Sequence, residues 1–123
     1  MGVNIYTSKE VTQIMESGAI AYETHMRIRE HIKPGVSTAE LDEVAREFIY
    51  SKKAKPAFLG LYGFPASICT CVNDRVVHGI PDKKQILDFN FGNMKTIRFF
   101  KILMKCLIHE WTICMKIPKG QVL

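Results

Sequence analysis

The residues best suited to chemistry gather between Gly60 and Asp82, in the run GLYGFPASICTCVNDRVVHGIPD. His78 stands at the end of an apolar run, directly before Gly79. A histidine in this position can present its ring to a cleft. The glycine that follows lets another part of the backbone approach closely. A single histidine at a strand end is also commonly a hydrogen-bonded structural residue. Position alone therefore leaves a functional and a structural interpretation of His78 open.

Two apolar runs within this stretch, residues 66–72 and 75–80, predict a pair of strands. Asn73-Asp74 lies between them and is typical of a tight turn. Pro65 and Pro81 bound the pair, because proline fixes φ and cannot donate a backbone hydrogen bond. We therefore expect a hairpin that ends at His78.

Three segments of the stretch occur in order along the chain: GFPASIC at 63–69, VN at 72–73 and VVHGIP at 76–81. Together they resemble the N-terminal half of a type I methionine aminopeptidase, and the resemblance runs from about residue 8 to residue 87. It implies an α+β chain with the N-terminal half of a pita-bread (creatinase/aminopeptidase) fold, truncated relative to that two-lobed fold. The implied activity is removal of the initiator methionine from nascent proteins.

The resemblance also implies a site. His78 would be catalytic and would also bind substrate, by hydrogen bonding near the scissile peptide bond. An apolar pocket for the methionine side chain would be walled by Phe58, Leu61, Tyr62, Phe64 and Cys69. Without the resemblance, the same five residues are more typical of a hydrophobic core than of a pocket wall.

The family uses two divalent metal ions (Co, Mn, Fe or Zn), and its metal ligands are missing from this sequence. Overlaying residues 87–92 on the family pattern V-N-x-D-x-G places Asn90 where a ligand aspartate is expected. Asp88 falls two residues early but would share the strand face of Asn90, so a substitute role for Asp88 stays open. The only later acidic residue is Glu110. Hard or borderline divalent ions favour carboxylate oxygens and imidazole nitrogen, so no metal-binding residue is assigned and the ions are predicted not to bind this chain.

Two functions follow as hypotheses. One is a metallo-aminopeptidase-like chain that is truncated or inactive, with nascent peptide N-termini and the ribosome as candidate partners. The other is a degenerate fragment that binds a peptide or a partner without catalysis. The net charge of +5 is modest, so we expect no nucleic-acid partner. No secretory signal is visible, which favours a cytoplasmic protein with its four cysteines reduced.

A first helix is predicted to begin at the capping box Thr7–Glu10 and to reach about Ile32, before Lys33-Pro34-Gly35. His25 and His31 are expected to be surface or groove residues. Apolar or small residues at helical spacing predict the buried face as Val11, Ile14, Met15, Gly18, Tyr22 and His25.

A second capping box, Ser37–Glu40, predicts a second helix that ends at the basic turn 51–55. Pro56 then begins an extended segment. The predicted buried stripe is Leu41, Val44, Ala45, Phe48 and Ile49, and the predicted outer face is Glu40, Asp42, Glu43, Arg46 and Glu47.

The sequence divides into a partial methionine aminopeptidase-like domain, residues 1–93, and a divergent basic and apolar tail, residues 94–123, expected to be helical. Polar residues recur every three or four positions in this tail: Arg98, Lys101, Lys105, His109, Thr112 and Lys116. Three interpretations stay open. The tail could be a membrane-contacting helix over residues 96–116. It could also be a helix that covers the partial domain of residues 1–93, or a non-native peptide produced by a frameshift or a mis-spliced end.

Overall fold

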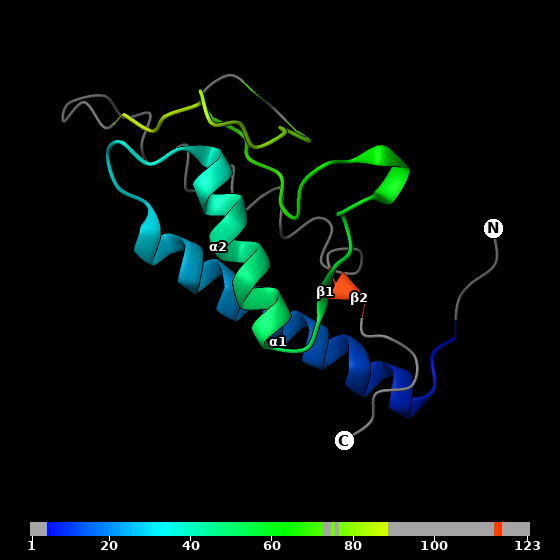
Figure 1. The fold of residues 1–123 in the computed structure, drawn as a ribbon. Coiled ribbons are helices and arrows are strands. Elements are labelled where there is room, and N and C mark those ends of the chain that lie inside the picture. Colours follow the sequence, from blue (N-terminus) through cyan, green and yellow to red (C-terminus); the bar gives the residue numbers. More distant parts are fainter. Residues whose placement is uncertain (1–4, 73–74, 76, 89–114, 117–123) are drawn as a thin grey trace.

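A computed structural model of the chain describes residues 5–72, 75, 77–88 and 115–116 (Figure 1). The first helix, α1, spans Ser8–His31 and begins at the predicted capping box. The Thr7 hydroxyl accepts the Glu10 backbone N–H at 3.3 Å, and the Glu10 carboxylate accepts the Thr7 N–H at 2.8 Å. Two backbone donors at the helix end are satisfied in this way, which confirms the predicted start.

The second helix, α2, spans Thr38–Ser51 and repeats the same device. The Ser37 hydroxyl accepts the Glu40 N–H at 3.2 Å, and the Glu40 carboxylate accepts the Ser37 N–H at 2.8 Å. The hydrogen bonds from Ser37 hold the pKa of the Glu40 carboxyl below its usual range. Both predicted helices are therefore confirmed with their capping residues.

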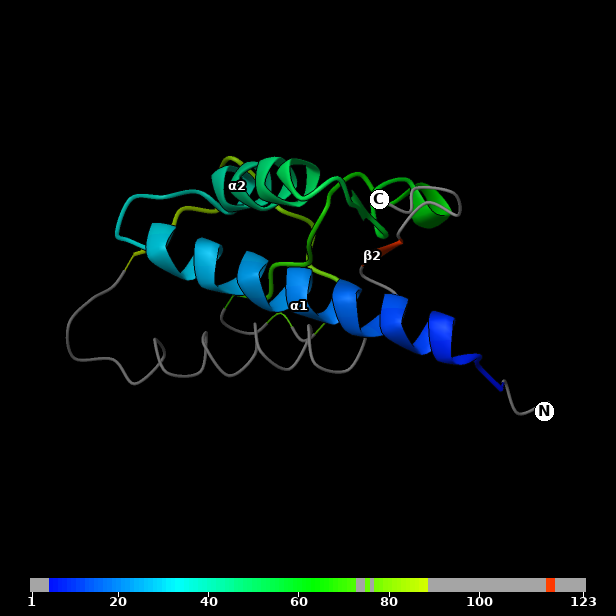
Figure 2. The ribbon, with the colours of Figure 1, turned by 90° about the horizontal axis from the view of Figure 1, so that it is seen from below.

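The α1 helix buries a different face from the one predicted. Its buried residues are Ser17, Ala21, Thr24 and Ile28, about a quarter turn away from the predicted stripe. Val11, Ile14, Met15 and Tyr22 of that stripe are exposed. The α2 helix packs against α1, as Figures 1 and 2 show from two directions. The small side chains on the buried face of α1 allow a close approach of the two helices. The Ser17 and Thr24 hydroxyls donate to Gln13 and Ile20 carbonyls of their own helix, which removes the cost of burying them.

The α2 helix buries Leu41, Ala45 and Ile49 as predicted, and Val44 and Phe48 are half-buried. The prediction for Asp42 was wrong, because this residue is only 4% exposed. Two clusters form the core: Ala21, Ile49, Ala54, Phe58 and Cys69 near one end, and Ile28, Val36, Leu41, Ala45, Ile68 and Leu87 near the other.

Regular strands are few among the described residues. The β1 strand, Lys55–Pro56, pairs antiparallel with β2, Met115–Lys116. Residues 66–72, 75 and 77–80 are not strands, so the predicted hairpin is not formed as regular β-structure. Its two arms still meet, because the Thr70 N–H donates to the Gly79 carbonyl at 2.8 Å. The predicted turn at Asn73-Asp74 lies outside the described residues.

The tail prediction can be compared with the structure only at β2. Residues 115 and 116 are extended, so the expected helix does not include them. The remaining tail residues, 94–114 and 117–123, lie outside the described residues, and the three interpretations of the tail stay predictions. Within the described part of the chain, no helix is long and apolar enough to cross a membrane.

The segment 82–87 is attached to the start of α2. The Thr38 hydroxyl accepts the Asp82 N–H at 2.9 Å and lies 3.1 Å from the Gln85 side-chain oxygen. The Leu87 N–H donates to the Val36 carbonyl at 2.8 Å. The chain that leaves His78 is therefore fixed to the helical pair within a few residues.

Candidate functional site

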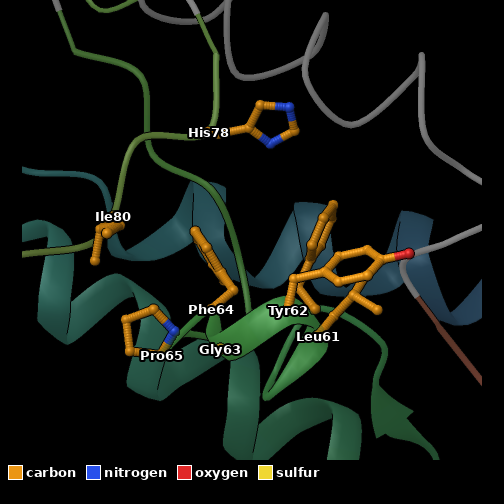
Figure 3. A pocket seen from close by; sticks show the side chains of 8 residues that line it. Leu61, Tyr62, Gly63, Phe64, Pro65, His78 and Ile80 are labelled. Carbon is orange, nitrogen blue, oxygen red and sulfur yellow. The ribbon is translucent and has the colours of Figure 1, made fainter.

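An apolar pocket of about 480 Å³ opens between the turn that follows Phe58 and the segment that carries His78 (Figure 3). His78 and Ile80 come from one segment, and the residues from Leu61 to Pro65 come from the turn opposite. Among the residues that the structure describes, the lining is Phe58, Leu61, Tyr62, Gly63, Phe64, Pro65, His78 and Ile80. Apolar walls with a few polar groups, here the His78 imidazole and the Tyr62 hydroxyl, are typical of a small-ligand site.

Two aromatic rings form the base of this pocket. The Phe58 and Phe64 centroids lie 5.8 Å apart, with their planes inclined at 56°. Phe58 is buried and also belongs to the core, whereas Phe64 is half-buried. A tilted aromatic pair gains from edge-to-face contact, so the base is held rigidly from the core side.

The turn between these rings needs an uncommon backbone. Gly60 and Gly63 have φ of +85° and +79°, and the Gly60 N–H donates to the Phe64 carbonyl at 2.9 Å. Tyr62, between them, has φ of +49° inside the short 3₁₀ helix Leu61–Gly63 and is fully exposed. A tyrosine in the left-handed region is strained by about 1–2 kcal/mol, a cost that proteins often accept at functional sites.

His78 shares this left-handed conformation, with φ of +52°. The Gly79 carbonyl accepts the Thr70 N–H, so the backbone directly after His78 is held against a buried segment. A Cβ atom at Gly79 would clash with the Thr70 carbonyl oxygen and would lie 2.8 Å from its carbon. The expected close approach of another backbone at Gly79 is therefore confirmed, and it aims the exposed His78 ring at the pocket.

The structure brings together five of the six residues predicted for the site: Phe58, Leu61, Tyr62, Phe64 and His78. Cys69 is not among the lining residues, because it is buried in the core cluster beneath Phe58. Sequence reasoning missed Gly63, Pro65 and Ile80 as lining residues. The signal was present in the runs GFP and GIP, where glycine and proline bring backbone to a surface.

The described residues do not fit a metal centre. No three His, Cys, Asp or Glu side chains of residues 5–72, 75 and 77–88 lie close enough together to hold an ion. Asp88 is exposed at the end of the described core. Asn90 and Glu110 lie outside the described residues. Hence no step of chemistry is assigned to a metal in this part of the chain.

A second histidine, His25, lies away from the described pocket lining, on α1. Within the described part of the chain its Nε2 atom is buried and has no hydrogen-bond partner. Burial lowers the pKa of the His25 imidazole, and a hydrogen bond with the Ala21 backbone opposes this only in part. His25 is therefore a half-buried residue whose burial favours the neutral form of the imidazole.

Comparison with known proteins decides the family. The model of Metallopeptidase family M24 matches residues 12–116. This chain belongs to that family. The match extends past residue 93, and the proposed division of the chain there stays a prediction.

Curated relatives in the family are methionine aminopeptidases. The enzyme of Buchnera aphidicola (subspecies Schizaphis graminum) is 48% identical over 87 residues, which cover 71% of this chain and 33% of the relative. Methionine aminopeptidase 1 of Bacillus subtilis is 45% identical over 82 residues, covering 67% and 33%. The predicted resemblance is therefore confirmed. This chain spans about a third of the length of the relatives it matches.

Solved structures agree. Methionine aminopeptidase from Rickettsia prowazekii superposes with a TM-score of 0.67 at 41% identity, over 71% of this chain and 35% of that one. The Thermotoga maritima enzyme gives a TM-score of 0.69 at 28% identity over the same shares. The described part of the chain therefore has the fold of part of the pita-bread architecture, as predicted.

Proposed function

We propose that this chain carries the methionine-binding part of a methionine aminopeptidase site. The observation that carries the proposal is the apolar pocket that opens beside His78. Its volume of about 480 Å³ lies in the range of small-molecule sites, and its walls are aromatic and aliphatic. A methionine thioether is flexible and gains from contact with aromatic rings, which Phe58 and Phe64 supply.

On this proposal, His78 binds the peptide group of the ligand, and the pocket binds the methionine side chain. The imidazole is one of two polar side-chain groups in the described lining, beside the Tyr62 hydroxyl, and it would hydrogen bond to the peptide group next to the methionine. The left-handed backbone of His78 and the hydrogen bond from the Thr70 N–H to the Gly79 carbonyl support this role, because they fix the position of the imidazole ring. A contribution to catalysis would come from the same hydrogen bond.

We further propose that the 123-residue chain binds peptide N-termini without hydrolysing them. The family is one of metallopeptidases, and the sequence places Asn90 where a ligand aspartate is expected. An amide is a much weaker ligand than a carboxylate for hard divalent ions. Nascent chains with an N-terminal methionine are the proposed partners, and the ribosome stays a prediction.

Calorimetric titration of the 123-residue chain with a Met-Gly-Ser peptide tests the binding proposal. We expect saturable binding that weakens about tenfold in His78→Ala, since one hydrogen bond to the peptide is lost. The substitution keeps a Cβ at the same positive φ, so backbone strain is unchanged. No binding by folded wild-type chain would overturn the proposal.

Methionine release from the same peptide, with Co²⁺ or Mn²⁺ added, tests the absence of hydrolysis. Wild type and an identically purified His78→Ala chain should both stay at background, which also controls for contaminating host aminopeptidase. Release that disappears in His78→Ala would show that the chain assembles a working site. Asp88→Asn would then be the first variant to make in a search for the ligands.

A further inference from the structure

A buried carboxylate links α2 to the chain that carries both pocket walls. One oxygen of Asp42 accepts the backbone N–H groups of Ser67 and Ile68, at 2.7 and 2.9 Å. Its other oxygen accepts the Arg46 guanidinium at 2.6 Å. Arg46 in turn donates to the Ser67 hydroxyl at 3.0 Å, so both side chains hold the same short segment.

Burying Asp42 is costly, and its contacts offset the cost. Its side chain is 6% exposed, and an unpaired carboxylate at that depth would be strongly destabilising. An ordinary ion pair four residues apart on a helix lies on the surface and contributes little. The two backbone N–H contacts make this pair different, because they tie a helix to a segment about 25 residues further along the chain.

The segment that Asp42 holds leads to both walls of the pocket. Pro65, which lines the pocket beside Phe64, stands two residues before Ser67. Thr70, two residues after Ile68, donates to the Gly79 carbonyl next to His78. Any shift of residues 67 and 68 would therefore move the Phe64 wall and the His78 wall relative to each other.

We infer that Asp42 is a positioning residue that sets the spacing between the Phe64 and His78 walls of the pocket. It touches no ligand itself and acts through the backbone of residues 67–70. The inference rests on the proposed function, since it concerns the same pocket. It extends that function by naming a residue on a helix outside the lining that determines the pocket's fit.

The test compares two peptides that differ only in the first residue, Met-Gly-Ser and Leu-Gly-Ser, with wild type, Asp42→Asn and Glu43→Gln. Asp42→Asn keeps the shape of the side chain and removes its charge. Glu43→Gln is the matched control, because it removes the same charge from an exposed neighbour on α2. The readout is the ratio of the two dissociation constants, measured by calorimetry at a temperature where circular dichroism shows each chain folded.

We expect Asp42→Asn to weaken Met-Gly-Ser binding about tenfold and to reduce the preference for methionine about threefold, because charge-assisted hydrogen bonds are lost. Glu43→Gln should match wild type. Simple loss of folded protein would weaken both peptides equally and leave the ratio unchanged, so an unchanged ratio overturns the inference. Failure of wild type to bind either peptide would overturn the proposed function instead.

If Asp42→Asn fails to fold, Arg46→Gln tests the same inference. This milder change removes the contacts to Ser67 and Asp42 and leaves the two backbone N–H contacts of Asp42 in place. We expect about a twofold loss of methionine preference, again relative to Glu43→Gln. An unchanged preference in folded Arg46→Gln would overturn the inference.

Discussion

Two segments that meet at Pro65 differ in their surroundings and in their backbone. Residues 66–70 are all buried, and their backbone is held by Asp42 and by Gly79. Residues 59–64 include a fully exposed tyrosine, and three of them have positive φ. The buried segment has few ways to move, whereas the exposed one is strained and open to solvent. Backbone strain and apolar exposure thus occur where a ligand would bind. The buried residues 66–70 form a rigid support beneath this exposed segment.

The largest expected effect comes from forcing the support and the His78 segment apart. Gly79→Ala places a Cβ against the Thr70 carbonyl, which backbone movement alone can relieve. We expect the free energy of unfolding to fall by about 3 kcal/mol or more, measured by urea denaturation. Gly35→Ala is the control, because φ is +88° there but nothing lies within 4 Å of the new Cβ. It should cost about 1 kcal/mol, and equal losses in the two variants would contradict the proposed clash.

Two buried threonines allow a matched test of how much a buried hydroxyl hydrogen bond contributes to stability. Thr38 and Thr70 are both 0% exposed, but only the Thr38 hydroxyl is hydrogen bonded, to Asp82 and Gln85. Within the described part of the chain, the Thr70 hydroxyl has no partner. Thr38→Val should lower the free energy of unfolding by about 2 kcal/mol, since it leaves the Asp82 N–H unsatisfied. Thr70→Val should be neutral or stabilising, and the opposite order in urea denaturation would contradict the account.

A smaller effect is expected from pH, through His25. The pKa of folded His25 is lowered from 6.5 by burial, so the unfolded chain binds the proton more readily. Its contribution to stability is therefore complete above about pH 6.5 and is lost as pH falls toward the folded pKa. Between pH 7.5 and 5.5, we therefore expect the free energy of unfolding to fall more in wild type than in His25→Gln. The pKa of Glu40 is also lowered, so its contribution to stability is present above about pH 4.5 and is lost only at lower pH, outside this window. Equal losses in both chains, measured by urea denaturation, would exclude His25 as the source.

The smallest effect should come from relaxing the exposed segment. Tyr62→Gly removes a left-handed tyrosine, and the relief is partly offset by the greater freedom of unfolded glycine. We expect the chain to become about 0.5 kcal/mol more stable and to bind Met-Gly-Ser about threefold more weakly, because the turn is less preorganised. Tighter binding to the glycine variant would show that the strain does not serve the pocket.

The helices could be predicted from the sequence because their starts are local. Each capping box depends on residues three apart, and both were found where expected. The buried face of α1 could not be predicted from periodicity, because two stripes have helical spacing. The stripe with Met15 and Tyr22 is the more apolar of the two, but α2 packs against the stripe with Ser17, Ala21 and Thr24.

Asp42 escaped prediction for a related reason. A charged residue beside Glu43 is typical of a solvated helix face. The backbone N–H groups that hold Asp42 in the core lie about 25 residues further along the chain, so the local pattern does not indicate them. Cys69 was placed in the pocket wall, whereas the core beneath Phe58 contains it. The rest of the pocket was predictable, because five of its residues fall in or next to glycine- and proline-containing turns that present side chains at a surface.

The most direct test of the central claim is a nuclear Overhauser measurement on the 123-residue chain with a Met-Gly-Ser peptide that is ¹³C-labelled at the methionine methyl group. The account predicts cross-peaks from this methyl to the ring protons of Phe58 and Phe64. An excess of unlabelled Met-Gly-Ser should remove both signals by competition, whereas the same excess of Gly-Gly-Ser should leave them in place. Cross-peaks that lead instead to the exposed α1 residues Met15 and Tyr22, with none to Phe58 or Phe64, would contradict it.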